Sequence, residues 1–299
     1  MTTFNFGNGP VPAHQHPNGG GWVADTTTVS ETAYVGPNAR VFDNAKVYAN
    51  AVVDDGAWVY ENAEVYDNAV VTVNARVYGH AVVSGNARVY NNAWVSGNAW
   101  VYGTAMVTVN AKVFGNAWVY GNAVVTDYAR VYGNAWVSDY AKVFDDAVVI
   151  GNARVYGHAV VSGYAVVSGN AWVSGHAAVS GHTMVTCDAR VSGNARVSGN
   201  AMVSGNARVS GNAMAFGNAE VSGDAMVFDD AWVFGKAMVI EGAKVFGQAM
   251  VFEDAKVFGK AMVEGTAVVN GDAVVNGDAE VYGDAYDSGS ILLSENYKR

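Results

Sequence analysis

Ala and Val recur at a fixed interval of six residues along most of the chain. Ala stands at every sixth position from residue 33 to residue 285, and Thr183 is the one exception. Val recurs in the same way from Val29 to Val281, two residues after the Ala, and Ala215 is the one exception. Two residues that are two positions apart lie on one face of a strand, and the residue between them lies on the other. The pattern therefore predicts one short strand in every six residues.

The remaining residues of each unit predict a sharp corner. The commonest unit reads Ala-x-Val-Ser/Tyr/Phe-Gly-Asn, as in residues 195–200. Gly and Asn both tolerate a positive φ, so we expect this pair to form the turn. A short strand and a bend that repeat without insertion or deletion must coil. Three hexads, 18 residues, would make one triangular coil with one inward Ala and one inward Val on each side.

The apolar composition fits this narrow interior. Hydrophobic residues make up 51% of the 299 residues, yet Leu occurs only at Leu292 and Leu293. A helical core without Leu is implausible, because Leu is a strong helix former and a major component of such cores. The fold class predicted is therefore an all-β parallel solenoid of about 14 coils over residues 29–286.

Both ends of the chain depart from the repeat. Residues 1–28 contain Pro10, Pro12 and Pro17, and we interpret them as an N-terminal cap. Residues 287–299 carry the sequence Ile-Leu-Leu at 291–293, and we interpret them as a C-terminal cap or tail. A solenoid exposes a strand edge at each end, and an open edge invites association. Either segment could instead mediate assembly, and the sequence leaves both interpretations open.

The hexad pattern resembles a known repeat family. An aliphatic residue followed four positions later by a small one, as in Val41 and Ala45, is similar to the hexapeptide repeat of single-stranded left-handed parallel β-helices. Residues 20–23 (Gly-Gly-Trp-Val) and the recurring sequence Gly-Asn-Ala-Arg-Val resemble those of YdcK-like bacterial solenoids and phage-encoded repeat proteins. The left-handed sense is implied by this resemblance alone, because most parallel crossovers are right-handed. The resemblance also implies a bacterial or phage-infected host, with a host protein or small signalling molecule as partner.

Charge and hydropathy narrow the possible partners. The net charge of −10 divides into −6 for residues 1–73, +4 for residues 74–215 and −8 for residues 216–299. This distribution argues against a DNA mimic along the whole surface and equally against a general nucleic-acid binder. The sequence has no apolar run long enough for a signal peptide or a membrane span. We expect a cytoplasmic protein that does not contact a membrane.

Outward residues that are 18 positions apart should stack in columns, and one column stands out. It combines aromatic and cationic residues, and a neighbouring column on the same strands adds tyrosines. These are the candidate binding residues: Trp100, Tyr102, Trp118, Tyr120, Trp136, Arg154, Tyr156, Trp172, Arg190 and Arg208. A second face runs through Trp58, Arg76, Trp94, Lys112 and Arg130. Exposed rings with interleaved cations suit binding of a ligand or a partner. The alternative is a cross-strand ladder that only stabilises the sheet.

The histidines and the single cysteine give weaker signals. His158 and His176 are 18 apart, so their rings should lie about 5 Å from each other at one corner. Two ligands are too few for a secure metal site, and the pair of His14 and His16 in the N-terminal segment is equally short of ligands. Cys187 falls in the one irregular hexad, with Thr183, and we interpret it as local drift. No metal and no cofactor are predicted.

Together these features predict a non-enzymatic scaffold for binding or assembly. We expect a protein partner or a homo-oligomer, for which a trimer is one option, and a small-molecule ligand is a further option. The alternative is an acyl-CoA-dependent hexapeptide acyltransferase, or an inactive relative, with its site between subunits. Such enzymes commonly rely on loops that protrude from the coils, and this chain has no insertion in its hexads. Without such loops a histidine has little to position a substrate against it.

Overall fold

The computed structural model describes residues 2–287, 292–293 and 297–298, with side chains for residues 2–286. The chain divides into two compact units, residues 1–146 (unit 1) and residues 147–299 (unit 2). Each unit is a β-solenoid with about 18 residues per turn, and together they hold about 14 turns. Among the described residues, no helix could cross a membrane.

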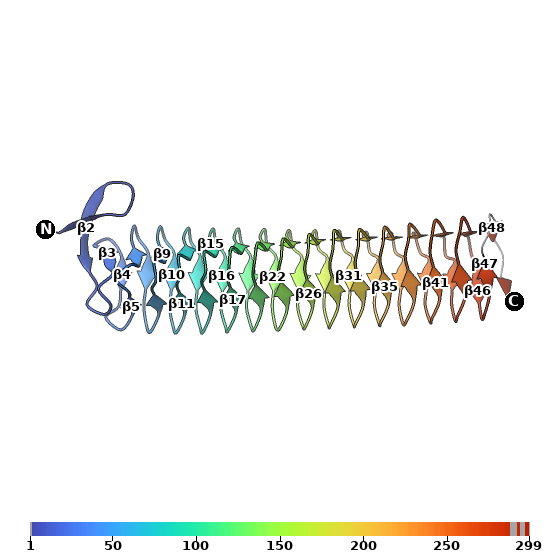
Figure 1. Cartoon of the computed structure of the whole chain (residues 1–299), viewed down its shortest axis with the longest axis horizontal. Helices are drawn as coiled ribbons and strands as arrows, with labels where there is room; N and C mark the ends of the chain where they lie inside the picture. Colours follow the sequence, from blue (N-terminus) through green and yellow to red (C-terminus); the bar gives the residue numbers. More distant parts are fainter. Residues whose placement is uncertain (1, 288–291, 294–296, 299) are drawn as a thin grey trace. The chain divides into compact units, whose positions relative to one another are not determined.

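The strands follow the six-residue period without interruption. From β4 (Thr28–Val29) to β45 (Val274–Val275), each strand has two residues and begins six residues after the strand before it. Each strand pairs in parallel with strands one turn away, so that Val101 lies beside Val119. Figure 1 shows these turns following one another within each unit. The predicted register of 18 residues is confirmed.

Three parallel sheets enclose the core of unit 1. Sheet 1 contains β3 (Trp22–Ala24) and then every third strand from β6 (Arg40–Val41) to β21 (Arg130–Val131). Sheet 2 runs in the same way from β4 to β22 (Trp136–Val137), and sheet 3 runs from β5 (Tyr34–Val35) to β23 (Lys142–Val143). Unit 2 has the same arrangement, and its three sheets begin at β24 (Val148–Val149), β25 (Arg154–Val155) and β26 (Val160–Val161).

The core consists of the inward Ala and Val side chains. From residue 33 to residue 285, these side chains are at most 1% exposed. Each side of a turn therefore contributes one small and one branched side chain, as the sequence predicts. Thr183 takes an inward Ala position and is completely buried, and its hydroxyl has no hydrogen-bond partner.

Gly and Asn have different roles at the corners. The Gly position generally takes the positive φ, as in Gly199 with φ 73°. The Asn that follows instead forms ladders between turns, for example from Asn98 Nδ2 to Asn116 Oδ1 at 3.0 Å. The expectation that both residues serve the turn through positive φ therefore holds for Gly. For Asn it holds at a few corners, including Asn74 with φ 60° and Asn92 with φ 61°.

The N-terminal segment packs onto sheet 1 of unit 1. β1 (Thr3–Asn5) and β2 (Pro10–Gln15) form an antiparallel hairpin, and β2 also pairs antiparallel with β3. β3 pairs in parallel with β6, so the parallel sheet begins at Trp22, before the first Val of the repeat. β2 occupies the edge of β3 with which another chain would otherwise pair.

Aromatic rings attach this hairpin to the first turns. The ring of Phe4 stacks on Trp22 at 4.5 Å, and that of Phe6 stacks on Phe42 at 5.0 Å. Phe6 and Phe42 are buried in one cluster with Ala13. These contacts hold the hairpin at the N-terminal end of unit 1, where Figure 1 shows it.

The last strands continue the three sheets of unit 2. β46 (Glu280–Tyr282), β47 (Tyr286–Asp287), β48 (Leu292–Leu293) and β49 (Tyr297–Lys298) each pair in parallel with a strand of the repeat. The predicted C-terminal cap begins within β47 and includes β48 and β49. Ile291 of that segment lies outside the described residues.

Candidate binding faces of the solenoid

Three tryptophans stack on the outer face of sheet 2 in unit 1. They come from β16 (Trp100–Val101), β19 (Trp118–Val119) and β22, and adjacent ring centres are 5.7 Å apart. The interplanar angles are 21° and 18°, so the indoles lie nearly parallel. Trp100 is 38% exposed, and Trp118 and Trp136 are each 36% exposed. The stack is held by strand register and still presents a large apolar surface.

Two tyrosines extend this stack at its side. Tyr102 and Tyr120 stack on each other at 5.0 Å, and Tyr102 meets Trp118 edge to face at 6.2 Å. Burial raises the pKa of Tyr102, with a further contribution from Tyr120. We call this group the tryptophan face: Trp100, Tyr102, Trp118, Tyr120 and Trp136.

The corresponding residues of unit 2 form a different arrangement. Trp172, on β28 (Trp172–Val173), lies between Arg154 and Arg190, whose guanidinium carbons are 5.3 and 4.7 Å from the ring centre. Tyr156 meets Trp172 edge to face at 6.4 Å. The predicted column therefore comprises stacked indoles in unit 1 and alternating cations and an aromatic ring in unit 2.

A shallow groove of about 390 Å³ lies beside the arginines of unit 2. Arg190 and Arg208 line it from β31 (Arg190–Val191) and β34 (Arg208–Val209). Two carboxylates face it from the adjacent corners, and each accepts an amide hydrogen bond. Asn170 Nδ2 donates to Asp188 at 3.0 Å, and Asn206 Nδ2 donates to Asp224 at 2.8 Å. The groove is thus polar and of mixed charge.

The second predicted face lies on sheet 1 of unit 1 and is a cation–π ladder. Trp58 lies between Arg40 and Arg76 at 5.0 and 4.9 Å. Trp94 lies between Arg76 and Lys112 at 5.5 and 4.6 Å. The faces of both indoles are covered by cations from the neighbouring turns. Their geometry fits the interpretation as a stabilising ladder.

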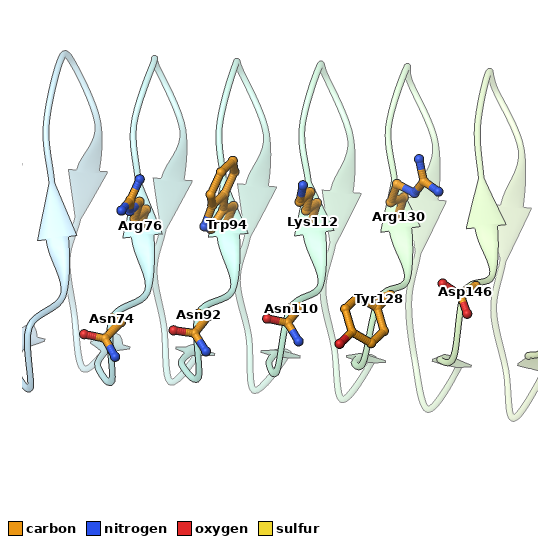
Figure 2. Close-up of a pocket in the computed structure, with 9 residues that line it drawn as sticks. All are labelled: Asn74, Arg76, Asn92, Trp94, Asn110, Lys112, Tyr128, Arg130 and Asp146. Carbon is orange, nitrogen blue, oxygen red and sulfur yellow. The ribbon is translucent and has the colours of Figure 1, made fainter.

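A larger groove of about 520 Å³ runs along this second face (Figure 2). Its strand residues are among those predicted from the sequence, whereas its corner residues were not predicted. The missed residues are Asn74, Asn92, Asn110, Tyr128 and Asp146. The same 18-residue spacing could have identified them, because corner residues that are 18 positions apart also stack in a column.

Several segments of the chain match the model of the YdcK β-solenoid repeat. The matched segments are residues 83–97, 87–103, 153–169, 189–205 and 195–209. These segments are therefore similar to the YdcK β-solenoid repeat. None of the curated proteins compared with the chain matches it. The matched YdcK repeats include six of the candidate residues: Trp100, Tyr102, Arg154, Tyr156, Arg190 and Arg208.

Corner columns of the repeats bring histidines together. The rings of His158 and His176 stack with centres 4.8 Å apart and planes 4° apart, which confirms the predicted spacing. Tyr164 and His182 stack in the same way at 4.7 Å. Among the described residues, no group of three or more His, Cys, Asp or Glu side chains is placed to hold a metal ion.

The histidines before the YdcK repeats have separate partners. His14 Nδ1 lies 2.8 Å from a carboxylate oxygen of Asp25, on the surface. His16 is buried, and its Nδ1 lies 3.2 Å from the carbonyl oxygen of Asn18. The structure therefore places the two rings in different environments.

The irregular hexad of residues 182–187 places Cys187 on the surface at a corner. Cys187 is exposed and takes φ 61°, at the position that Gly occupies in most repeats. Its backbone stacks against that of Gly169, which is one turn earlier in the chain. Thr183 of the same hexad faces the core, so the two residues do not share a site.

Proposed function

We propose that this YdcK β-solenoid protein is a non-enzymatic scaffold that binds a protein partner through the tryptophan face of unit 1. The supporting observation is the stack of Trp100, Trp118 and Trp136, three indoles that are each more than a third exposed. Trp and Tyr are enriched at the centres of protein interfaces, because they bury a large area and retain a polar edge.

The contrast with sheet 1 favours recognition over a purely structural role. Trp58 and Trp94 alternate with cations that cover their faces, and both are only partly exposed. The tryptophan face instead places indoles on consecutive turns. A ladder stabilises a sheet in either arrangement, but consecutive indoles also form a continuous apolar patch for a partner to cover.

The chemistry of this face suits packing rather than proton transfer. It consists of indole and phenol rings, and burial raises the pKa of Tyr102 further above neutral pH. Indole N–H and phenol O–H groups can donate hydrogen bonds to a partner's backbone.

Site-directed cross-linking tests the proposal in cells that produce the protein. A photoreactive phenylalanine analogue replaces Trp118, and a matched variant carries it in place of Trp232, a 40% exposed tryptophan of unit 2. We expect a specific protein adduct from position 118 and none from position 232. The purified adduct partner is then titrated against the full chain.

Trp118→Ser/Trp136→Ser should weaken binding of that partner by at least about tenfold, as expected for central interface aromatics. Trp232→Ser should leave the affinity unchanged. If the partner is a second copy of the chain, light scattering should show the double variant as a smaller species than the wild type. Unchanged affinity in a folded double variant, or equal adducts at both positions, would overturn the proposal.

A further inference from the structure

The groove of about 520 Å³ on sheet 1 of unit 1 is built from two rows of side chains. Figure 2 shows a strand row that runs from Arg76 to Arg130 and a corner row that runs from Asn74 to Asp146. Residues within each row are one turn apart, which is about 4.8 Å for stacked parallel strands. The groove therefore follows the stacking direction of the turns and suits an extended ligand.

The strand row is strongly cationic in an otherwise acidic protein. Arg76, Lys112 and Arg130 line the groove, whereas the whole chain carries a net charge of −10. Among the described residues, none of the ion pairs involves these three side chains. Their charge is available to an anionic ligand, and Lys112 and Arg130 are exposed.

The aromatic ring of this row is not available for stacking. Trp94 lies between Arg76 and Lys112, which approach its ring centre to 5.5 and 4.6 Å. Binding of nucleobases to single-strand binding proteins depends on open aromatic faces. This groove must instead recognise its ligand by charge and hydrogen bonds.

The corner row supplies those hydrogen bonds. At other corners the Asn side chains bond to one another between turns, as Asn98 does to Asn116 at 3.0 Å. Within the described part of the chain, the side chains of Asn74, Asn92 and Asn110 form no such ladder. Each amide therefore has donors and an acceptor free for hydroxyl groups.

The local backbone explains why the ladder stops here. The N–H groups of Asn74 and Asn92 donate back to the carbonyl oxygens of Asp55 and Val73 in the previous turn, each at 3.0 Å. The N–H of Asn98 instead donates forward to Gly115 at 2.7 Å, as at most other corners. Asn74 and Asn92 also take a positive φ. The corner peptides at Asn74 and Asn92 are thus reoriented beside the groove, whereas the N–H of Asn110 donates forward to Asp127 at 2.9 Å.

We propose that this groove binds an anionic oligosaccharide. Carboxylate or sulfate groups of the sugar chain would contact Arg76, Lys112 and Arg130, and its hydroxyl groups would contact the amides of the corner row. The strand spacing sets Arg76 and Lys112 about 10 Å apart and Lys112 and Arg130 about 5 Å apart. The site is independent of the tryptophan face, which lies on sheet 2.

The position of Asp146 favours binding of a ligand with widely spaced negative charges over binding of a dense polyanion. Its carboxylate lines the same groove, beyond Tyr128 in the corner row. A nucleic acid or a polyphosphate would bring closely spaced negative charges against this carboxylate. A saccharide can instead place a hydroxyl group there, because only some of its substituents are charged.

Calorimetric titration of the full chain tests the proposal with defined probes. The probes are an oligogalacturonate hexamer, which carries carboxylates, and a heparin-derived hexasaccharide, which carries sulfates. Maltohexaose serves as the neutral control, and inorganic polyphosphate and a single-stranded oligonucleotide serve as the dense polyanions. We expect at least one acidic oligosaccharide to bind, the neutral sugar not to bind, and the dense polyanions to bind more weakly.

Matched variants separate groove recognition from overall charge. Lys112→Gln/Arg130→Gln should weaken oligosaccharide binding by about tenfold or more. Arg88→Gln/Lys142→Gln removes one Lys and one Arg, both exposed, from sheet 3 of the same unit and should leave the affinity nearly unchanged. Asn110→Ala should weaken binding of the oligosaccharide and leave binding of polyphosphate unchanged.

Three results would overturn the proposal. They are an absence of binding by either acidic sugar, equal losses in the two double variants, and tighter binding of polyphosphate or oligonucleotide than of the sugars. Trp118→Ser/Trp136→Ser should keep oligosaccharide binding, so failure of the tryptophan face as a partner site remains distinguishable from failure of this groove.

Discussion

The guanidinium carbon of Arg190 lies 4.7 Å from the ring centre of Trp172, from the strand next to it in the same sheet. Arg154 approaches the same ring from the strand on the other side. The indole is therefore flanked by two cations from the strands that the register places on either side of it. Register thus converts an 18-residue spacing in the sequence into a specific side-chain contact.

Arg190→Gln should destabilise unit 2 by about 0.5–1 kcal/mol, because it removes one partly exposed cation–π contact. Arg196→Gln is the matched control. Arg196 is an exposed arginine on the strand that follows that of Arg190 in the sequence. Its lateral neighbours in its own sheet are Ala178 and Met214, neither of them aromatic. The two variants are compared by urea unfolding, followed by tryptophan fluorescence. Equal stabilities would show that the contact contributes nothing measurable.

Thr183→Ala should stabilise the protein. The Thr183 side chain is completely buried at an inward Ala position, and its hydroxyl has no hydrogen-bond partner. Leaving a buried hydroxyl unpaired costs about 1–3 kcal/mol, and Ala removes that group. Part of the gain is offset by the lost packing of the methyl group. We expect a higher melting temperature by calorimetry. The opposite change at the inward position one hexad earlier, Ala177→Thr, should lower the melting temperature.

Val109→Gly should also stabilise the protein, although Gly normally weakens β-structure. Val109 takes φ 59° at a corner, where a β-branched side chain is strained. Relief of a left-handed conformation is worth about 1–2 kcal/mol, partly offset by the greater freedom of Gly in the unfolded chain.

Val124→Gly is the control for this substitution. Val124 faces outward on β20 (Val124–Val125), where loss of the side chain should destabilise the sheet by up to about 1 kcal/mol. Thermal unfolding of both variants should give shifts of opposite sign. Destabilisation by both would argue against strain at Val109.

The regular part of this fold follows from the sequence because one rule applies at every hexad. Ala and Val take every inward position of the repeat except that of Thr183, so their positions predict the strands, the inward face and the register. The register in turn predicts lateral contacts such as that between His158 and His176, observed at 4.8 Å. The start of the parallel sheet at Trp22 was not predicted, because Gly21 and Thr27 stand where the repeat has Ala, although Val23 lies six residues before Val29.

The candidate sites were less predictable, because they depend on side-chain conformation and on local backbone changes. Register puts Trp94 beside Arg76 and Lys112, but only the structure shows that these cations cover the indole. The reoriented corners at Asn74 and Asn92 still read as ordinary turn residues in the sequence. A period of six is also compatible with either hand of coil, so the left-handed sense rests on the family resemblance.

Tyr48 and Tyr60 should make stability depend on pH in the alkaline range. Burial raises the pKa of Tyr60 to about 12, and burial together with Glu64 raises that of Tyr48 to about 12. An unfolded tyrosine titrates near pH 10. Between about pH 10 and pH 12 the unfolded state therefore binds fewer protons than the folded state, and the free energy of unfolding falls as pH rises. This contribution is fully present below about pH 10.

Tyr48→Phe/Tyr60→Phe removes both linked titrations, so its stability should fall less steeply over the same range. The measurement is urea unfolding of wild type and variant at several alkaline pH values, with the two slopes compared so that other titrating groups cancel. Tyrosinate absorbance of the folded wild type should also rise later with pH than that of the unfolded chain. Parallel slopes for the two proteins would show that these phenols titrate alike in the folded and unfolded states.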